Sequence, residues 1–302
     1  QSATAFGTDT IHIINNEIKN FYYYGIYGYY TRVVNIENNN IHKSTKTATT
    51  SNYGIYLYYS SAAKVLNNRV HDSSVPTLNT TNSIYPIYLY APTNDNNAAN
   101  ATLIANNAIY NVGNYGGTLY GIYVSQGYHT NIYHNTISQN FTSSGTSTQY
   151  GVYLSNCSGT FNIKNNIVDF KGGNQATKYG IYISSTSALA ANGLQMNTVN
   201  MASTQSGTQY RTYYGTAYVD LPALRTAYPL LEVNTRDIDP VFTNITNGLI
   251  EPINPGIYRT GENLTALVPR DIDNATRSTT PTIGAKEMVA PLNVDLALLK
   301  FT

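Results

Sequence analysis

An internal repeat is the feature that most constrains the fold. A motif of the form Tyr-Gly-Ile-Tyr, in which Pro or Val replaces one residue in some copies, occurs six times between residues 24 and 182, with a degenerate copy at Tyr214-Gly215. Successive copies lie close together, with 29 residues from Gly25 to Gly54 and 30 from Gly121 to Gly151. A unit this short cannot bury a core by itself, so the repetition predicts a solenoid in which each unit stacks on the next.

A second repeat lies between these copies and has the form apolar-x-x-Asn-x-apolar, as in Ile36…Asn39…Ile41. The two elements give each unit three short strands, an asparagine turn and a Ser/Thr/Gly-rich loop, which describes one coil of a parallel β-solenoid. Asparagine tolerates the left-handed conformation that a sharp bend requires, and its amide can bond to the same side chain one coil away. We predict an all-β solenoid of about seven to eight coils. Its asparagine ladder comprises Asn16, Asn39, Asn68, Asn107, Asn135, Asn166 and Asn197.

These Asn-Asn-x-Ile/Val repeats resemble those of the right-handed parallel β-helix proteins, a superfamily that includes pectate-lyase-like and other polysaccharide-lyase-like proteins, over about residues 11–235. The C-terminal part is similar to the closing segments of secreted bacterial β-helix proteins. That similarity rests on Asp239-Pro240-Val241-Phe242, Asn254-Pro255-Gly256-Ile257-Tyr258, Asp271-Ile272-Asp273-Asn274 and Ile283-Gly284-Ala285-Lys286-Glu287, of which the second and third depart from the family pattern. The resemblance implies a right-handed parallel β-helix over 1–235, a closing segment over 236–290 and a tail or linker to a further domain over 291–302.

Charge is sparse and balanced, with 17 Lys+Arg against 16 Asp+Glu and 11% charged residues. Without a basic block, nothing supplies the electrostatic attraction that dominates nucleic-acid binding, so we expect no nucleic-acid partner. The apolar runs are too short to span a bilayer, so we also expect no membrane insertion. The single cysteine, Cys157, excludes an intramolecular disulfide framework and is interpreted as an inert buried thiol.

Residues suited to catalysis are scarce in the repeats. Between Ser73 and Ile163 the one residue among Asp, Glu, Lys and Arg is Asp95. The best constellation is the column that follows each closing apolar residue. It comprises Lys19, His42, His71, Tyr110, Ser138, Asp169 and Asn200. His42 and His71 on adjacent coils, with Arg69, Asp72 and Glu37 nearby, would offer a general base and a neutralising charge. The other interpretation is a solvated polar face, and we expect no catalytic residue.

Acidic residues are densest in the closing segment, at Asp237, Asp239, Asp271 and Asp273. A calcium site needs several converging oxygens, and the repeats hold no Asp/Glu cluster. We expect these four residues to serve turns and caps, with calcium as the weaker alternative, and we expect no cofactor and no metal.

Tyrosine dominates the predicted outer surface. The second tyrosine of each repeat should face outward and form a ladder of Tyr27, Tyr56, Tyr88, Tyr123, Tyr153 and Tyr182. Aromatic faces and hydroxyl groups suit sugar rings and also suit another protein surface, whereas cross-strand stacking alone is the purely structural alternative. The leading tyrosine, such as Tyr53, has inward parity and is expected at a corner.

These observations favour a non-catalytic, extracellular β-helix module of a bacterial surface or filament-forming protein, serving as scaffold, adhesin or glycan-contacting element. The alternatives are a secreted polysaccharide lyase or glycoside hydrolase, and a homopolymer of end-to-end coils. The expected partners are polysaccharide, other surface proteins, or further copies of the chain. The repeat begins at Ile13 and leaves little room for a cap, so we expect a piece of a longer protein or ends that stack on partners.

Overall fold

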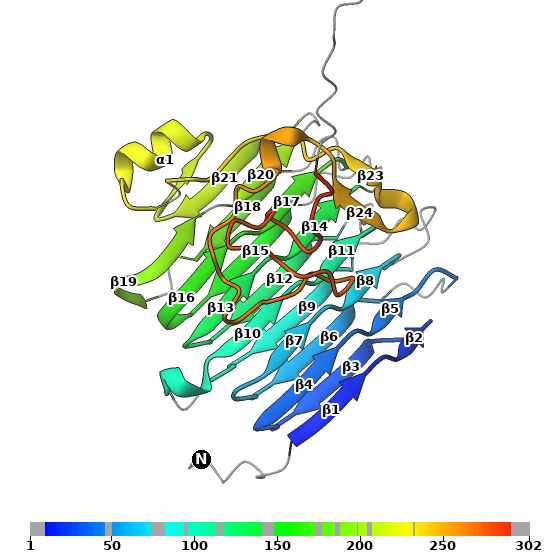
Figure 1. The fold of residues 1–302 in the computed structure, drawn as a ribbon. Helices are drawn as coiled ribbons and strands as arrows, with labels where there is room; N and C mark the ends of the chain where they lie inside the picture. The colour runs from blue at the N-terminus through cyan, green and yellow to red at the C-terminus, as the bar shows by residue number, and fades with distance from the viewer. Residues whose placement is uncertain are drawn as a thin grey trace, which may run out of the picture.

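The structure is a computed structural model of the protein, and it describes residues 10–45, 50–73, 82–93, 96–112, 117–140, 148–172, 177–184, 188–197, 199–203, 207–231 and 233–290. The tail or linker expected at 291–302 lies outside the described residues. The chain winds into a parallel β-solenoid, so the predicted all-β parallel β-helix is confirmed (Figure 1).

Three sheets form the walls of the solenoid, and each coil contributes one strand to each sheet. Sheet A holds β1 (Thr10–Ile14), β4 (Val33–Glu37), β7 (Lys64–Leu66), β10 (Thr102–Ala105), β13 (Thr130–Tyr133), β16 (Ser158–Lys164) and β19 (Ala188–Asn197). Sheet B holds β2 (Glu17–Lys19), β5 (Asn40–His42), β8 (Arg69–His71), β11 (Ala108–Tyr110), β14 (Thr136–Gln139), β17 (Ile167–Phe170) and β20 (Asn200–Ser203). Sheet C holds β3 (Tyr24–Tyr29), β6 (Asn52–Tyr58), β9 (Ile84–Tyr90), β12 (Leu119–Ser125), β15 (Gln149–Ser155), β18 (Lys178–Ile183), β21 (Gln209–Tyr214) and β22 (Thr216–Tyr218).

The core consists of apolar columns that run along the solenoid axis. In sheet A, Ile36 pairs in register with Val65, and Val65 pairs with Ile104; all three are fully buried. Sheets B and C repeat the arrangement with Ile41, Val70 and Ile109, and with Ile55, Ile87 and Ile122. Each such side chain contributes about 1.5–3 kcal/mol on burial, so the stacked columns hold the coils together.

Sheet C departs from strict alternation at its glycine position. In β6, Gly54 and Ile55 are both buried, whereas Tyr53 and Tyr56 on either side are half-buried and face outward. A Cβ on Gly54 would come within 2.6 Å of Val70 Cγ1, which favours glycine there; in β9 the equivalent buried residue is Pro86. The expectation that the leading tyrosine faces inward at a corner was therefore wrong, because two consecutive inward residues return it to the outer face.

Left-handed residues form a row at two corners of the solenoid. Between sheets A and B the row consists of Asn15, Asn38, Asn67, Asn106, His134 and Asn165, with φ from 53° to 59°. After sheet C it consists of Tyr30, Tyr59, Ala91, Gln126 and Asn156, with φ from 50° to 53°. The bend was predicted on the ladder asparagines themselves, and this was wrong: the left-handed residue is the one before, as Asn38 precedes Asn39. The turn at Asn38 is what lets Asn39 point inward, where it is 1% exposed.

Six asparagines form a continuous ladder beneath this corner: Asn16, Asn39, Asn68, Asn107, Asn135 and Asn166. At each step Nδ2 donates to Oδ1 of the next asparagine at 3.0 Å, and the backbone N–H donates to the same oxygen. Each Nδ2 from Asn39 onward also donates to a carbonyl of the previous coil, as Asn68 does to Ile36 at 2.8 Å. The ladder thus satisfies backbone groups that the bend takes out of the sheets.

The last coil is out of step with the sequence pattern. Ile163 pairs with Met196, so the ladder position three residues further on is occupied by Val199, and Asn197 lies outside the ladder. The pattern around Asn197 matched the repeat two residues too early. Strand β19 has three residues more than β16 between the pairs Gly159–Leu189 and Phe161–Leu194, so the repeat is out of phase there. The Val199 N–H donates instead to Thr235 Oγ1 at 3.2 Å, which stands in for the missing amide oxygen.

At the C-terminal end of sheet C the chain turns back after β21 and covers the edge of the sheet. Strand β22 pairs antiparallel with β21, and α1 (Leu221–Ala227) follows, capped by Asp220 Oδ1, which accepts from the Ala223 N–H at 2.8 Å. Leu221 joins the main core from this helix. Stacking another coil on this edge of sheet C would therefore require β22 to be displaced.

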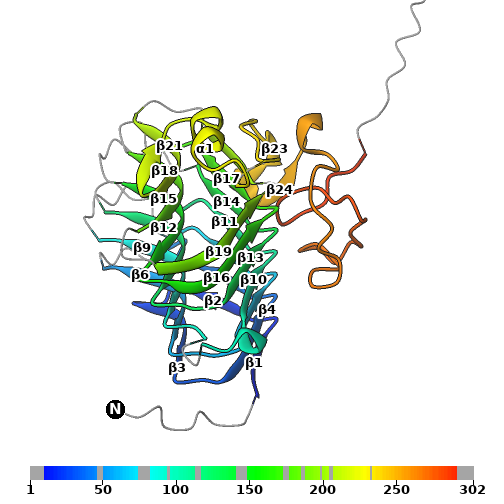
Figure 2. The ribbon, with the colours of Figure 1, turned by 90° about the vertical axis from the view of Figure 1, so that its left-hand side faces the viewer.

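The closing segment, residues 236–290, runs back along the outside of sheet B (Figure 2). It contains β23 (Phe242–Asn244), β24 (Leu249–Pro252) and the short 3₁₀ helices η2 (Ile245–Asn247) and η3 (Pro255–Ile257); a further one, η1 (Ala98–Asn100), precedes β10. Ile250 and Ala285 pack on Ala108 and Tyr110 of β11, so the segment covers the middle of the sheet. No helix within the described part of the chain is long and apolar enough to cross a membrane.

Candidate functional site

Two rows of tyrosines cover the outer face of sheet C, and we call them together the tyrosine face. The first row is Tyr24, Tyr53, Tyr85, Tyr120, Tyr150, Tyr179 and Tyr210. The second row is Tyr27, Tyr56, Tyr88, Tyr123, Tyr153, Tyr182 and Tyr213. The sequence predicted the second row to Tyr182; the first was missed because the parity argument assumed unbroken alternation.

The rings are in contact along both rows and between them. Neighbouring centroids lie 4.7–5.4 Å apart in the first row and 4.3–5.3 Å apart in the second. Tyr24 and Tyr27 of one coil are 4.8 Å apart, which joins the two rows. Because most neighbouring rings stack, their faces are occupied by one another, and the face presents ring edges and hydroxyl groups to the outside.

The second row changes its tilt in the middle. Tyr88 and Tyr123 stack at 15°, and Tyr153 and Tyr182 at 3°, but Tyr123 and Tyr153 meet edge to face at 88°. The first row continues through the same coils with Tyr120 and Tyr150 at 13°. The edge of one ring therefore contacts the face of the next at this single point along the second row.

The tyrosine face is almost free of charge. Its seven parallel strands contain two charged residues, Lys178 and Arg211. Lys178 is fully buried, and Arg211 forms an ion pair with Asp237 of the closing segment. Burial and the neighbouring tyrosines raise the pKa of Tyr53 and Tyr153 to about 12. The hydroxyl groups therefore stay neutral and able to donate and accept hydrogen bonds.

The histidine column predicted from sequence begins as expected. Lys19 pairs with His42, His42 with His71, and His71 with Tyr110. The His42 and His71 rings stack with centroids 5.0 Å apart, and His71 stacks on Tyr110 at 4.7 Å. In the last coil the register differs from the prediction. Asp169 pairs with Ala202, so Asn200 is not in the column, because the repeat is displaced there by two residues, as at Asn197.

The ring nitrogens of both histidines are already engaged. His71 Nδ1 lies 2.8 Å from Asp72 Oδ2, and Nε2 lies 2.8 Å from Asn40 Oδ1. Burial raises the pKa of Asp72, but the hydrogen bond and charge of His71 outweigh it and hold the pKa below its usual range. His42 Nε2 lies 3.3 Å from Glu17 Oε1, an acid that the sequence argument overlooked.

The remaining residues of this constellation do not converge on the histidines. Glu37 lies on β4 of sheet A, across the Asn38 bend from His42. Arg69 Nη2 forms an ion pair with Asp273 Oδ1 at 2.6 Å, and Asp273 is shared with Lys286. The arrangement is a satisfied polar cluster that anchors the closing segment, with no ring nitrogen of His71 left for a substrate.

The closing segment covers the upper part of the same column. Tyr110 is 6% exposed and packs so closely on Gly248 that a Cβ there would lie 2.8 Å from its hydroxyl oxygen. Asp169 is fully buried, and its Oδ2 accepts from Ser138 Oγ at 3.1 Å. Burial raises the pKa of Asp169 to about 7. These positions are inaccessible to a polymer, which removes most of the column from consideration as a binding face.

The left-handed asparagines fasten the closing segment to the solenoid. Asn165 Nδ2 donates to the Glu262 carbonyl at 2.8 Å, and Asn165 Oδ1 accepts from the Glu262 N–H at 2.9 Å. Asn106 Nδ2 donates to the Arg270 carbonyl at 2.6 Å. The polar residue before each ladder asparagine was visible in the sequence, but its role in holding a segment about 100 residues or more away was not.

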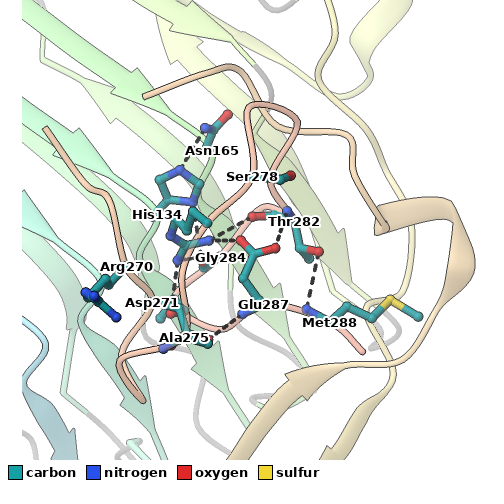
Figure 3. A network of polar contacts seen from close by, with 12 residues as sticks. His134, Asn165, Arg270, Asp271, Ala275, Ser278, Thr282, Gly284, Glu287 and Met288 are labelled. Atoms are coloured by element: carbon teal, nitrogen blue, oxygen red, sulfur yellow. Dashed lines mark hydrogen bonds and ion pairs between the residues drawn. The ribbon is translucent and has the colours of Figure 1, made fainter. Parts of the chain in front are cut away.

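A buried network centres on Arg277, and Figure 3 labels its partners Glu287, Thr282 and Gly284 together with His134. Its side chain is fully buried, pairs with Glu287, and donates to Asn106 Oδ1 and the Gly284 carbonyl, both at 2.9 Å. His134 completes the network: Nδ1 lies 3.3 Å from the Gly284 carbonyl, and Nε2 accepts from Asn165 Nδ2 at 2.9 Å. Burial, followed by the charge of Arg277, holds the pKa of His134 well below its usual range, so the ring is neutral.

The acidic residues of the closing segment are each engaged in turns or ion pairs. Asp271 Oδ1 accepts from the N–H groups of Asp273 and Ala275, and its Oδ2 from that of Glu287. Asp239 Oδ1 accepts from the Val241 N–H and from Lys171 Nζ. Across the described ranges, no group of three or more His, Cys, Asp or Glu residues is placed to hold a metal ion.

Cys157 has the surroundings of a structural thiol. It is fully buried, and burial raises its pKa to about 12.

Comparisons with known proteins agree with this architecture. A family model described as "Right handed beta helix region" matches residues 4–199. No curated protein matches the chain.

Proposed function

The chain belongs to the right-handed β-helix family, and from that premise we propose that it is a non-catalytic β-helical module that binds neutral polysaccharide along its tyrosine face. The observation that carries the proposal is the pair of tyrosine rows, in register over seven parallel strands that expose almost no charge. The fold alone assigns no activity, so we infer the function from the chemistry of this surface.

The chemistry of the face suits a hydroxyl-rich, uncharged polymer. Rows of neutral phenol groups repeat once per coil and can exchange hydrogen bonds with successive sugars of a chain lying along the solenoid axis. Ring edges between the hydroxyl groups supply apolar contact. An acidic polymer would need cations, yet Lys178 is buried and Arg211 is paired with Asp237. The same lack of charge favours polysaccharide over a charged protein surface.

The state of the histidine cluster supports a binding role over the lyase or hydrolase alternative. Polymer cleavage needs a free general acid or base within reach of the substrate. In His71 both ring nitrogens face acceptor oxygens, and the carboxylate of Asp273 is divided between Arg69 and Lys286.

We assign the module to the outside of a bacterial cell, as part of a surface protein that contacts glycans. The low charge and the Tyr/Asn-rich surface suit adhesion to polysaccharide or to other surface proteins. Fractionation of the source cells, followed by detection of the protein in the wall or the medium, would test this assignment; retention in the cytoplasm would contradict it.

The binding proposal is tested with insoluble and soluble polysaccharides, neutral and acidic, scored for bound protein and for released reducing ends. We expect binding to a neutral polymer without release of product. The double variant Tyr88→Ser/Tyr123→Ser should lose binding, whereas Tyr258→Ser in the closing segment, matched in chemistry but off the face, should retain it. Cleavage of any polymer, or binding that survives in the double variant while it remains folded, would contradict the proposal.

A further inference from the structure

The exposed tyrosines are concentrated at one end of the array. Among the described residues, all the exposed tyrosines lie in the first coil, from Tyr24 at 39% to Tyr29 at 59%. This first-coil cluster comprises Tyr22, Tyr23, Tyr24, Tyr27, Tyr29 and Tyr30. Its rings contact one another, as Tyr29 and Tyr30 do at 4.6 Å, and Tyr24 and Tyr27 begin the two rows.

No other easily oxidised side chain competes at the surface. The chain contains no tryptophan, one cysteine and three methionines. Cys157 is fully buried, and the most exposed of the methionines, Met288, is 8% exposed. A one-electron oxidant that approaches the protein from solvent therefore meets tyrosine as its main reducing partner.

The rows also provide a continuous path between distant coils. Both rows run without a gap from β21 to β3. Within each row, the ring centroids of tyrosines in neighbouring coils lie no more than 5.4 Å apart. Neighbouring phenols at this separation can exchange an electron without an intervening group. A radical formed on a tyrosine of any coil can thus migrate to the first coil.

We propose that the tyrosine face delivers oxidising equivalents to the first-coil cluster, where phenoxyl radicals of two molecules of this chain couple to dityrosine. Each phenol gives one electron to the oxidant and one proton to water, forming a phenoxyl radical. Two radicals join through a carbon–carbon bond between ring positions ortho to oxygen, and the two ring hydrogens return the phenol hydroxyls. With a haem peroxidase as the one-electron oxidant, two phenols and one hydrogen peroxide give one dityrosine and two waters.

Radicals settle at the first coil because oxidation of a phenol releases its proton, and water must accept it. The tyrosines of the middle coils are half-buried, so water reaches their hydroxyl groups less readily. In the first coil the rings reach solvent. Coupling between molecules also requires two rings to approach, which the exposed cluster permits more readily than the flanked rings of the rows.

The test is oxidation of the full chain by a haem peroxidase and hydrogen peroxide, read by dityrosine fluorescence, covalent dimer on denaturing gels, and mass spectrometry of the linked peptides. Wild type should give a dimer linked through residues 22–30. A variant with Phe at all six cluster positions keeps the stacking and should lose the dimer. A matched variant with Phe at Tyr179, Tyr182, Tyr210, Tyr213, Tyr214 and Tyr228 should retain it.

A second variant tests transfer along the rows. Replacement of Tyr85, Tyr88 and Tyr90 of β9 by Phe interrupts the path, so linked peptides from the coils above β9 should appear beside those from the first coil. An unchanged pattern of linked peptides in this variant would overturn the transfer step. Dimer retained in the first-coil variant, or fluorescence confined to monomer in wild type, would overturn the coupling site. No polysaccharide is present, so either result is independent of glycan binding.

Discussion

Arg277 Nη2 donates a 2.9 Å hydrogen bond to Asn106 Oδ1, which joins the closing segment to a bend of the solenoid 171 residues earlier in the chain. Asn106 in turn donates to the Arg270 carbonyl, so the contact works in both directions. The hydrophobic columns stabilise the coils, but this polar contact fixes where the closing segment lies.

Replacing Arg277 by Leu should destabilise the protein strongly. The change leaves the Glu287 carboxylate and the Gly284 carbonyl without their buried donor, and breaking a buried ion pair in this way costs about 3–5 kcal/mol. Chemical denaturation of the variant measures the loss. Arg32→Leu, at an exposed arginine of the second coil, serves as control and should change the free energy of unfolding by less than about 0.5 kcal/mol. Equal effects in the two variants would contradict the assigned role of Arg277.

The asparagine ladder predicts a contrast between Asn107 and Asn197. Asn107→Ala in the middle of the ladder removes bonds to Asn135 and Val65 and should cost about 2–4 kcal/mol, because several buried groups lose their partners. Asn197→Ala, outside the ladder, should cost less than half as much. The melting temperatures of the two variants measure these losses. A larger loss for Asn197→Ala than for Asn107→Ala would indicate that Asn197 belongs to the ladder.

A substitution at Gln126 can relieve backbone strain at the left-handed corner after sheet C. Its φ is 53° and its side chain is exposed, so the residue carries backbone strain with little packing to offset it. Gln126→Gly should raise the free energy of unfolding by about 0.5–1 kcal/mol, since glycine adopts this conformation freely. Gln126→Val should lower it, because a β-branched residue is poorly tolerated there. Denaturant titration of both variants should give shifts of opposite sign.

His134 makes stability depend on pH in a defined direction. The folded pKa lies well below that of the unfolded chain, which is about 6.5. Below about pH 6.5 the unfolded state binds a proton that the folded state does not, so this contribution is complete above that pH and falls by about 1.4 kcal/mol per pH unit below it.

The variant for this test is His134→Asn, which suits the same left-handed position as Asn165. The difference in unfolding free energy between wild type and variant should change between about pH 5 and 6.5 and stay constant above. Asp169, whose raised pKa acts in the opposite sense, is present in both proteins and cancels in the difference. A difference that does not vary with pH would show that His134 is not held neutral.

The repeat predicted the coil, its three strands and six ladder asparagines, because each of these follows from local periodicity. The predictions were wrong where additional residues interrupted the repeating pattern. Gly54 adds an inward position and turns Tyr53 outward, and the register shift in β19 places Asn197 outside the ladder. The contacts of Asn106 and Asn165 with the closing segment could not be predicted, since they depend on how a distant segment folds back.

A neutral polymer that lies along the tyrosine rows should contact several coils at once. The most direct measurement is the affinity for neutral oligosaccharides of increasing length, at low and high salt, for wild type and for Tyr88→Phe/Tyr123→Phe, which keeps the rings and removes two hydroxyl groups. We predict an affinity that rises with oligosaccharide length, does not respond to salt, and falls in the Phe variant. Affinity that weakens with salt, is independent of length, or is unchanged in the variant would exclude binding of a neutral polymer along the rows.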